Sequence, residues 1–263
     1  MRLADHYDGF LVDLDGVVWL GHEMIAGAAA TLNSLVADGK SVAFVTNSPR
    51  LSPAEQAEVL RAGGVEVEAK QVVTAGSTLI AAAVERFGPG PSVIATGTDS
   101  FLGQIEAAGI LLLAHSRWEE AEAVLVSGHS GFDYDELKAT SMAARAGAML
   151  AATGRDPTMP MPDGYWPGTG SILAAIETAS GRTGIVTGKP EARIFEAGLK
   201  AIGAGEPSNT SMRVAMIGDR ADTDVGGAQS AGIDGILVGG HEAPGVEPDH
   251  RISDLTGLMG PVP

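Results

Sequence analysis

The chain has 263 residues, 44% of them hydrophobic and 19% charged, which is enough to bury one large core or two moderate ones. It carries 17 Lys and Arg against 33 Asp and Glu, and the resulting net charge of −16 disfavours a nucleic-acid-binding protein and one that lies on anionic lipid. The absence of cysteine excludes disulfides, thiolate metal sites and a cysteine nucleophile. We find no apolar run of membrane-spanning or signal-peptide length, so we expect a cytoplasmic protein.

Apolar runs of strand length alternate with amphipathic helical patterns from the N-terminus onward. Strands are predicted at residues 10 to 14 and 41 to 46, and each is followed by a predicted helix, at residues 25 to 39 and 53 to 64. Pro53 favours the start of the second helix, because proline suits the first helical position.

The middle of the chain repeats this alternation as a separate series. Strands are predicted at residues 92 to 96, 123 to 128 and 148 to 153, and helices at 99 to 109, 134 to 147 and 171 to 181. A Pro- and Gly-rich loop is expected between residues 153 and 170. We therefore predict a separate α/β domain at residues 77 to 182, inserted into a core made of residues 1 to 76 and 183 to 263.

The last part of the chain returns to the first pattern. Strands are predicted at residues 184 to 188, 213 to 218 and 235 to 240, with helices at 191 to 203 and 226 to 232. Apolar strands alternating with helices indicate a parallel sheet covered on both faces. The predicted fold class is α/β, with a Rossmann-like parallel-sheet core and an inserted α/β domain.

Polar side chains follow several predicted strands at the point where each ends. They are Asp13 and Asp15, then Thr46, Asn47 and Ser48, then Lys189, and finally Asp219, Asp222 and Asp224. Because the carboxyl ends of parallel strands meet at one edge of a sheet, we expect these groups to converge. Each group alone also fits a charged turn, an ordinary loop or a surface lysine. A calcium loop of EF-hand type is excluded, since Val17 and Met24 would occupy ligand positions.

Converging carboxylates at the end of a buried strand repel one another unless a cation lies among them. Carboxylate oxygens favour Mg²⁺, which commonly shares its coordination shell with waters and a substrate phosphate. A lysine and nearby hydroxyl and amide donors suit the phosphoryl group itself. The sequence therefore predicts a site for Mg²⁺ and a phosphoryl group.

The motifs DLDGV, VTNS, GKP and GDRADTD, in this order, resemble the four motifs of the haloacid dehalogenase-like phosphohydrolases. The insert between the second and third motifs is similar to the large α/β cap of subfamily IIA, which includes p-nitrophenyl, sugar, glycerol phosphate and phosphoglycolate phosphatases. The second motif departs from the T-N-N-S of many relatives, because Ser48 takes the place of the second Asn.

The resemblance implies roles for the acidic residues. Asp13 would be the nucleophile that becomes a phosphoaspartate, and Asp15 would be the general acid and then the general base. Mg²⁺ would be bound by a carboxylate oxygen of Asp13, the backbone carbonyl of Asp15 and Asp219, with Asp224 holding a metal-bound water or orienting the ligands.

The resemblance also implies a phosphate site and a specificity loop. Thr46, Asn47 and Ser48 would hold the phosphoryl oxygens, and Lys189 would offset their charge and keep Asp13 ionised. In the cap, the loop that commonly reads T-N-x-D in relatives reads TGRD, residues 153 to 156, so Asp156 and Arg155 are the candidates for substrate specificity. Plain alternatives are a turn residue for Asp156 and a surface position for Arg155.

Three aromatic side chains near these loops have two interpretations each. Trp166 could stack on a substrate or belong to the cap core, and Trp19 and His22 could control access to the site or pack on the solvent side. We expect solvent-side packing for Trp19 and His22.

Together these features predict a Mg²⁺-dependent phosphatase that hydrolyses a small phosphate monoester of the sugar phosphate, glycerol phosphate or phosphoglycolate class. A homodimer is expected, because caps of this kind often mediate dimers in relatives. The alternatives are a receiver-type signalling domain, a binding protein without turnover and a phosphomutase on the same core.

Overall fold

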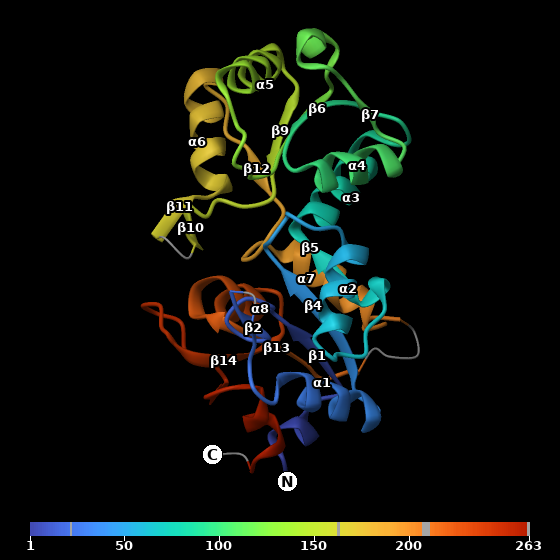
Figure 1. Cartoon of the computed structure of the whole chain (residues 1–263), viewed down its shortest axis with the longest axis vertical. Helices are drawn as coiled ribbons and strands as arrows, with labels where there is room; N and C mark the ends of the chain where they lie inside the picture. The colour runs from blue at the N-terminus through green and yellow to red at the C-terminus, as the bar shows by residue number, and fades with distance from the viewer. Residues whose placement is uncertain (22, 162–163, 207–210, 262–263) are drawn as a thin grey trace. The chain divides into compact units, whose positions relative to one another are not determined.

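The computed structural model describes residues 1–21, 23–161, 164–206 and 211–261, and the chain forms two compact units (Figure 1). The first, called the core unit below, contains Met1–Thr46, Pro53–Val73 and Lys189–Pro263. The second, called the cap unit, contains Asn47–Ser52 and Thr74–Gly188. The inserted segment therefore begins at Thr74 and ends at Gly188, where the sequence places it at residues 77 to 182.

The core unit is built on a six-stranded sheet with the order β15-β14-β13-β1-β4-β5. Its strands are β1 (Gly9–Val12), β4 (Ser41–Thr46), β5 (Val72–Thr74), β13 (Val214–Arg220), β14 (Asp234–His241) and β15 (His250–Ile252). Strand β1 pairs in parallel with β4 on one side and with β13 on the other. The predicted α/β fold with a parallel core sheet is confirmed.

Helices cover both faces of the core sheet. They are α1 (Ala28–Ala37), α2 (Pro53–Ala62), α7 (Ala192–Ala201) and α8 (Gly226–Ser230). On one face, Phe10 and Phe44 of the sheet pack in one cluster with Leu32 of α1 and Leu60 of α2. On the other, Gly198 brings α7 so close to the sheet that an added Cβ would lie 2.9 Å from Val45. Successive side chains of β1 and β4 point to opposite faces of the sheet, so each strand packs against a layer of helices on both faces.

The cap unit has its own five-stranded sheet, in the order β12-β9-β8-β6-β7. The strands are β6 (Ser92–Thr96), β7 (Leu111–Leu112), β8 (Ala123–Val126), β9 (Met149–Ala152) and β12 (Ile185–Val186), and the helices are α3 (Ala75–Phe87), α4 (Asp99–Ala107), α5 (Tyr134–Ala146) and α6 (Thr169–Ser180). One apolar cluster joins the sheet to α5 and α6, and another joins it to α3 and α4, so each face has a helical layer (Figure 1). Within the described part of the chain, none of the helices has the length and apolar character needed to span a membrane.

Two small hairpins and several short helices complete the described structure. The hairpins pair β2 (Trp19–Leu20) with β3 (Glu23–Met24), and β10 (Thr158–Met161) with β11 (Gly164–Pro167). The short helices are the 3-10 helices η1 (Leu3–His6), η2 (Ala69–Gln71), η3 (His115–Glu120) and η5 (Leu255–Met259), and one π-helical turn, η4 (Ala221–Val225).

Three sequence expectations need correction. The strand predicted at residues 184 to 188 is β12, which pairs with β9 in the cap sheet instead of joining the core. The loop expected between residues 153 and 170 contains the antiparallel pair β10 and β11. Helix α3 was not anticipated, although Thr74 caps its start with a side chain that accepts from the Ser77 N–H. The first error arose because a short apolar run does not show which sheet a strand joins. The second arose because prolines within a run argue against a strand, so β10 and β11 were not predicted.

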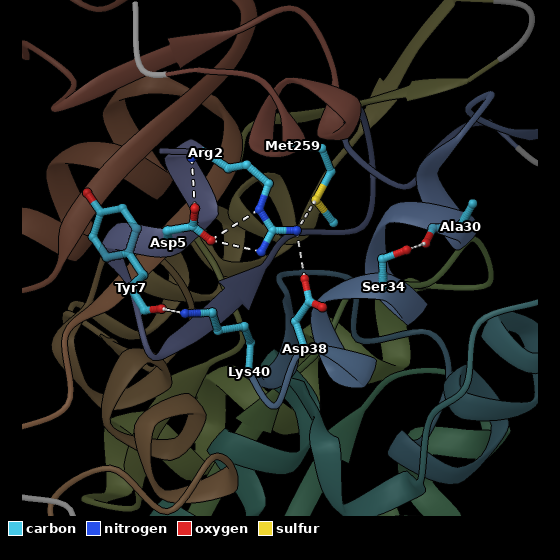
Figure 2. Close-up of polar contacts among 8 residues, drawn as sticks. All are labelled: Arg2, Asp5, Tyr7, Ala30, Ser34, Asp38, Lys40 and Met259. Atoms are coloured by element: carbon cyan, nitrogen blue, oxygen red, sulfur yellow. Dashed lines mark hydrogen bonds and ion pairs between the residues drawn. The ribbon is translucent and has the colours of Figure 1, made fainter.

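A polar cluster ties the N-terminus of the core unit to its last turn (Figure 2). The Arg2 guanidinium donates to the carboxylates of Asp5 and Asp38, each at 2.8 Å, and lies 3.7 Å from the sulfur of Met259. Beside it, the Lys40 ammonium donates to the Tyr7 carbonyl at 2.6 Å. These groups are partly exposed, so they fix the path of the first residues more than they stabilise the fold.

Replacing Phe44 by alanine should lower the free energy of unfolding by about 3–5 kcal/mol, because Phe44 is fully buried in the core-unit cluster and the change leaves a cavity. Denaturant titration measures this difference. Val36→Ala is the control, since Val36 is 38% exposed on α1 and its truncation should change stability by less than about 0.5 kcal/mol. Equal effects of the two substitutions would contradict the described core.

Candidate active site

Three aspartates come together at the carboxyl ends of the central core strands. Asp13 directly follows β1, Asp219 lies near the end of β13, and Asp224 lies in the π-helical turn η4. One carboxylate oxygen from each lies within 4.8 Å of the others. Strand β1 lies between β4 on one side and β13 on the other, so the strand order changes direction at β1. Open parallel sheets bind ligands at the carboxyl ends of the strands at such a point, and the cluster lies there.

Lys189 completes this cluster. Its ammonium lies 2.8 Å from an oxygen of Asp13 and 2.6 Å from an oxygen of Asp224. Lys189 is 4% exposed, Asp13 7% and Asp224 0%, so all three ionisable groups are removed from water. Asp224 is held further by the backbone N–H of Arg220, which donates to its second oxygen at 3.0 Å. The convergence expected for the polar strand ends is thus present for these four residues.

The pKa values of these groups depend on burial and on their neighbours. Burial raises the pKa of Asp13 to about 8, Lys189 acts in the opposite direction, and Asp224 adds to the rise. Burial and then Asp224 raise the pKa of Asp219 above its usual range. Although burial lowers the pKa of Lys189, Asp13 and Asp224 raise it overall, so the ammonium stays protonated. Lys189 therefore lowers the pKa of Asp13, as expected, but burial raises that pKa by more.

Two glycines permit the close approach of the carboxylates. Gly16 has a φ of +79°, and a Cβ there would lie 2.4 Å from a carboxylate oxygen of Asp219. Gly218, within β13, would place a Cβ 2.4 Å from an oxygen of Asp224. Neither close approach was predicted from the sequence, although a glycine inside a strand pattern, as at Gly218, signals one.

Asp15 has a different environment from Asp13. Its side chain is exposed, and one of its oxygens accepts a hydrogen bond from the indole N–H of Trp19 at 2.9 Å. Trp19 is 8% exposed and belongs to the core-unit cluster, so the expectation of solvent-side packing is wrong. The reason is the tight turn after Asp15, which folds Trp19 back over the sheet. His22 lies outside the described residues.

The second-motif residues occupy the end of β4 and the loop after it. Thr46 is the buried last residue of β4, and Ser48 is half-buried in the loop. Asn47 and Asp156 both belong to the cap unit, where the Asn47 amide nitrogen lies 3.5 Å from an Asp156 carboxylate oxygen. The structure therefore links the second motif to the candidate specificity loop through these two side chains.

The other cap candidates have contacts within the cap unit. The Arg155 guanidinium pairs with both carboxylate oxygens of Glu177, at 2.7 and 3.1 Å, and donates to the Gly184 carbonyl at 2.8 Å. Glu177 was not identified from the sequence. Trp166 lies on β11 and is 38% exposed, so it is not part of the cap core.

The cluster of Asp13, Asp219 and Asp224 fits a divalent cation. Its donors are carboxylate oxygens, which Mg²⁺ prefers, and their spacing allows one ion to contact all three. Without a cation, burial works against the ionised form of Asp13 and of Asp219. A Mg²⁺ ion would reverse this preference, because it favours the carboxylate form of its ligands.

Comparison with known proteins identifies the family. Residues 10–111 match the haloacid dehalogenase-like hydrolases, and residues 186–258 match a second family described as HAD-hydrolase-like. The chain belongs to the haloacid dehalogenase-like hydrolases, in subfamily IIA, as the motifs suggested.

Similar proteins include two named phosphatases and one solved structure. The chain is 33% identical to the D-glycerol 3-phosphate phosphatase of Mycobacterium tuberculosis, over 90% of the chain and 64% of that protein, and so spans under two thirds of its length. It is 32% identical to phosphoglycolate phosphatase 2 of Arabidopsis thaliana, over 90% of the chain and 84% of that protein. A crystal structure of glycerol phosphate phosphatase from Mycobacterium tuberculosis in complex with magnesium has a TM-score of 0.87, with 28% identity over 98% of this chain and 79% of that one.

Mg²⁺ affinity should rise with pH up to about 8, by at most about tenfold per pH unit, because the ion must displace a proton from Asp13. Below its pKa the buried Asp13 holds that proton, and above it the ligand is already ionised. Titration calorimetry between pH 6 and pH 9 measures the slope. The same affinity at every pH would contradict a protonated Asp13 in the metal-free protein.

Gly218→Ala should weaken Mg²⁺ binding at least about tenfold, because the new methyl group forces Asp224 from its position. Calorimetry of the folded variant checks this. The matched control is Gly103→Ala in helix α4, where a Cβ meets nothing within 4 Å and alanine is the better helix former. Wild-type affinity in Gly218→Ala would mean that Asp224 does not support the metal site.

Proposed function

We propose that the chain is a Mg²⁺-dependent phosphatase that hydrolyses a small phosphate monoester through a phosphoaspartate on Asp13. The observation that carries this proposal is the buried ion pairing of Lys189 with Asp13 and Asp224, next to Asp219. A lysine and a carboxylate cluster at the end of a parallel sheet form a site that can hold both a cation and a phosphoryl group.

The metal would be held by the carboxylates of Asp13 and Asp219 and by the backbone carbonyl of Asp15. Asp224, fixed by Lys189 and by the Arg220 N–H, is suited to holding a metal-bound water or orienting the ligands. Bound Mg²⁺ supplies positive charge that offsets the charge of the phosphoryl oxygens and of the attacking carboxylate.

In the first step an oxygen of Asp13 attacks phosphorus, and the bond between phosphorus and the ester oxygen breaks. Asp15, initially protonated, gives its proton to the departing oxygen, which leaves as an alcohol. The exposed position of Asp15 suits this exchange, whereas the buried Asp13 is suited to nucleophilic attack.

In the second step a water molecule attacks the phosphorus of the phosphoaspartate. Asp15, now ionised, accepts a proton from that water, the bond between phosphorus and the Asp13 oxygen breaks, and inorganic phosphate leaves. Both aspartates return to their starting forms, so the cycle consumes one ester and one water.

The phosphoryl oxygens would be held by the Thr46 hydroxyl, the Asn47 and Ser48 donors and the Lys189 ammonium. Thr46 and Lys189 are both buried in the core unit. A dry site strengthens charge-assisted hydrogen bonds to a phosphoryl group.

The proposed substrates are small phosphorylated metabolites of the glycerol phosphate, phosphoglycolate or sugar phosphate class, in line with the two relatives named above. Asp156 is the stronger candidate for contact with the leaving group, since the Arg155 guanidinium is already paired with Glu177. We further propose a cytoplasmic enzyme that forms a homodimer.

Phosphate release from a panel of small esters, including p-nitrophenyl phosphate and glycerol 3-phosphate, tests the function. The wild type should hydrolyse at least one ester with Mg²⁺, and a chelator should abolish release. Asp13→Asn should lower turnover by roughly a thousandfold or more, because it removes the nucleophile.

Asp222→Asn is the matched control in this experiment. Asp222 belongs to the same acidic segment, but its exposed side chain pairs with Arg220 at 3.0 Å. This variant should keep turnover within about threefold of the wild type. An active Asp13→Asn variant, or release that survives the chelator, would refute the mechanism.

A further inference from the structure

Asp15 differs from the other acidic residues of the site in how its side chain is held. Asp13 and Asp224 are buried and share the Lys189 ammonium, whereas Asp15 is exposed. Among the described residues, its carboxylate has one recorded partner, the indole N–H of Trp19 at 2.9 Å. An exposed aspartate without such a partner samples several rotamers.

The Trp19 indole is a rigid donor. The residue is 8% exposed and its side chain packs in the core-unit cluster, so the direction of the N–H is fixed by packing. The backbone is fixed as well, because the Leu14 carbonyl accepts the Trp19 N–H at 3.2 Å and the Trp19 carbonyl accepts the Gly16 N–H at 2.8 Å. Strand β2 then pairs Trp19 with Met24.

We infer that Trp19 is a positioning residue that fixes the Asp15 carboxylate for proton transfer. The indole N–H occupies one oxygen of Asp15, and the second oxygen stays available to carry the proton. This inference rests on the proposed function, in which Asp15 protonates the leaving alcohol as the bond to phosphorus breaks. Proton transfer depends steeply on such placement, since the donor must lie within hydrogen-bond reach of the ester oxygen.

A purely structural role would also explain the contact, because a buried indole N–H needs an acceptor. The two roles differ in their dependence on the leaving group. An alkoxide is a strong base and needs a proton as it leaves, whereas p-nitrophenolate is weakly basic and leaves without one. A loss of positioning therefore slows alkyl esters selectively, and a general structural defect slows both kinds of ester.

The experiment compares kcat/KM of the wild type and Trp19→Phe, with Mg²⁺, for p-nitrophenyl phosphate and for the alkyl phosphate that the wild type hydrolyses fastest. This ratio reports the steps up to the departure of the leaving group. In Trp19→Phe, kcat/KM for the alkyl ester should fall roughly 10- to 100-fold, as expected for the loss of a hydrogen bond to a carboxylate whose charge develops while Asp15 gives up its proton. The value for p-nitrophenyl phosphate should fall by less than about threefold. Equal losses, or no loss for the alkyl ester, would overturn the inference.

Two further variants separate positioning from folding. Replacing Trp19 by benzothienylalanine keeps the shape of the ring but substitutes sulfur for the N–H, and it should reproduce the selective loss. Trp118→Phe makes the same change as Trp19→Phe at a partly buried position packed against the cap cluster, and it should leave the ratio of the two kcat/KM values unchanged. A wild-type ratio with benzothienylalanine, or a selective loss in Trp118→Phe, would refute the role of the indole N–H.

The outcomes also distinguish the inference from the function on which it rests. A wild-type chain that hydrolyses neither ester overturns the proposed function and the inference together. A wild type that hydrolyses both, with an unchanged preference in Trp19→Phe, overturns the inference alone.

Discussion

The buried ammonium of Lys189, shared by Asp13 and Asp224, is the interaction on which the rest of the site depends. Three carboxylates gathered in one place, two of them buried, would repel one another. Removing one partner of a buried ion pair typically costs about 3–5 kcal/mol. Lys189 offsets one of the three negative charges, and a divalent cation would offset the other two. Because Lys189 alone does not offset all the negative charge, burial raises the pKa of both Asp13 and Asp219.

The backbone, and not side-chain packing alone, makes this arrangement possible. Gly16 and Gly218 leave room for Asp219 and Asp224, respectively. Lys189 itself follows Gly188, where a Cβ would lie 2.3 Å from the Thr153 carbonyl oxygen. The segment that delivers the lysine is therefore fixed by a close approach that other residues would block.

Much of this structure could be predicted from the sequence, and the exceptions have physical causes. The alternation of apolar strands and amphipathic helices predicted the parallel sheets, and the polar residues at strand ends predicted the meeting of Asp13, Asp219, Asp224 and Lys189.

The sheet to which residues 184 to 188 belong could not be predicted, since a two-residue strand fits either sheet. The contact of Trp19 with Asp15 depends on a turn that folds the chain back, which local hydrophobicity does not encode. The pairing of Arg155 with Glu177 depends on the packing of α6 against the loop before it.

The pairing of β1 with β13 sets the order in which the parts of the site are assembled. Gly9 of β1 lies opposite Val214 of β13, although the whole cap unit lies between these two residues in the sequence. During synthesis the DLDGV segment leaves the ribosome long before its partners, and contacts between segments so distant in the chain form slowly because of the entropy of closing the loop. Until β13 and η4 are made, Asp13 has neither Asp219 nor Asp224 beside it and remains an ordinary hydrated carboxylate. A nascent or truncated chain that ends before this point therefore carries Asp13, the proposed nucleophile, without the environment that would activate it.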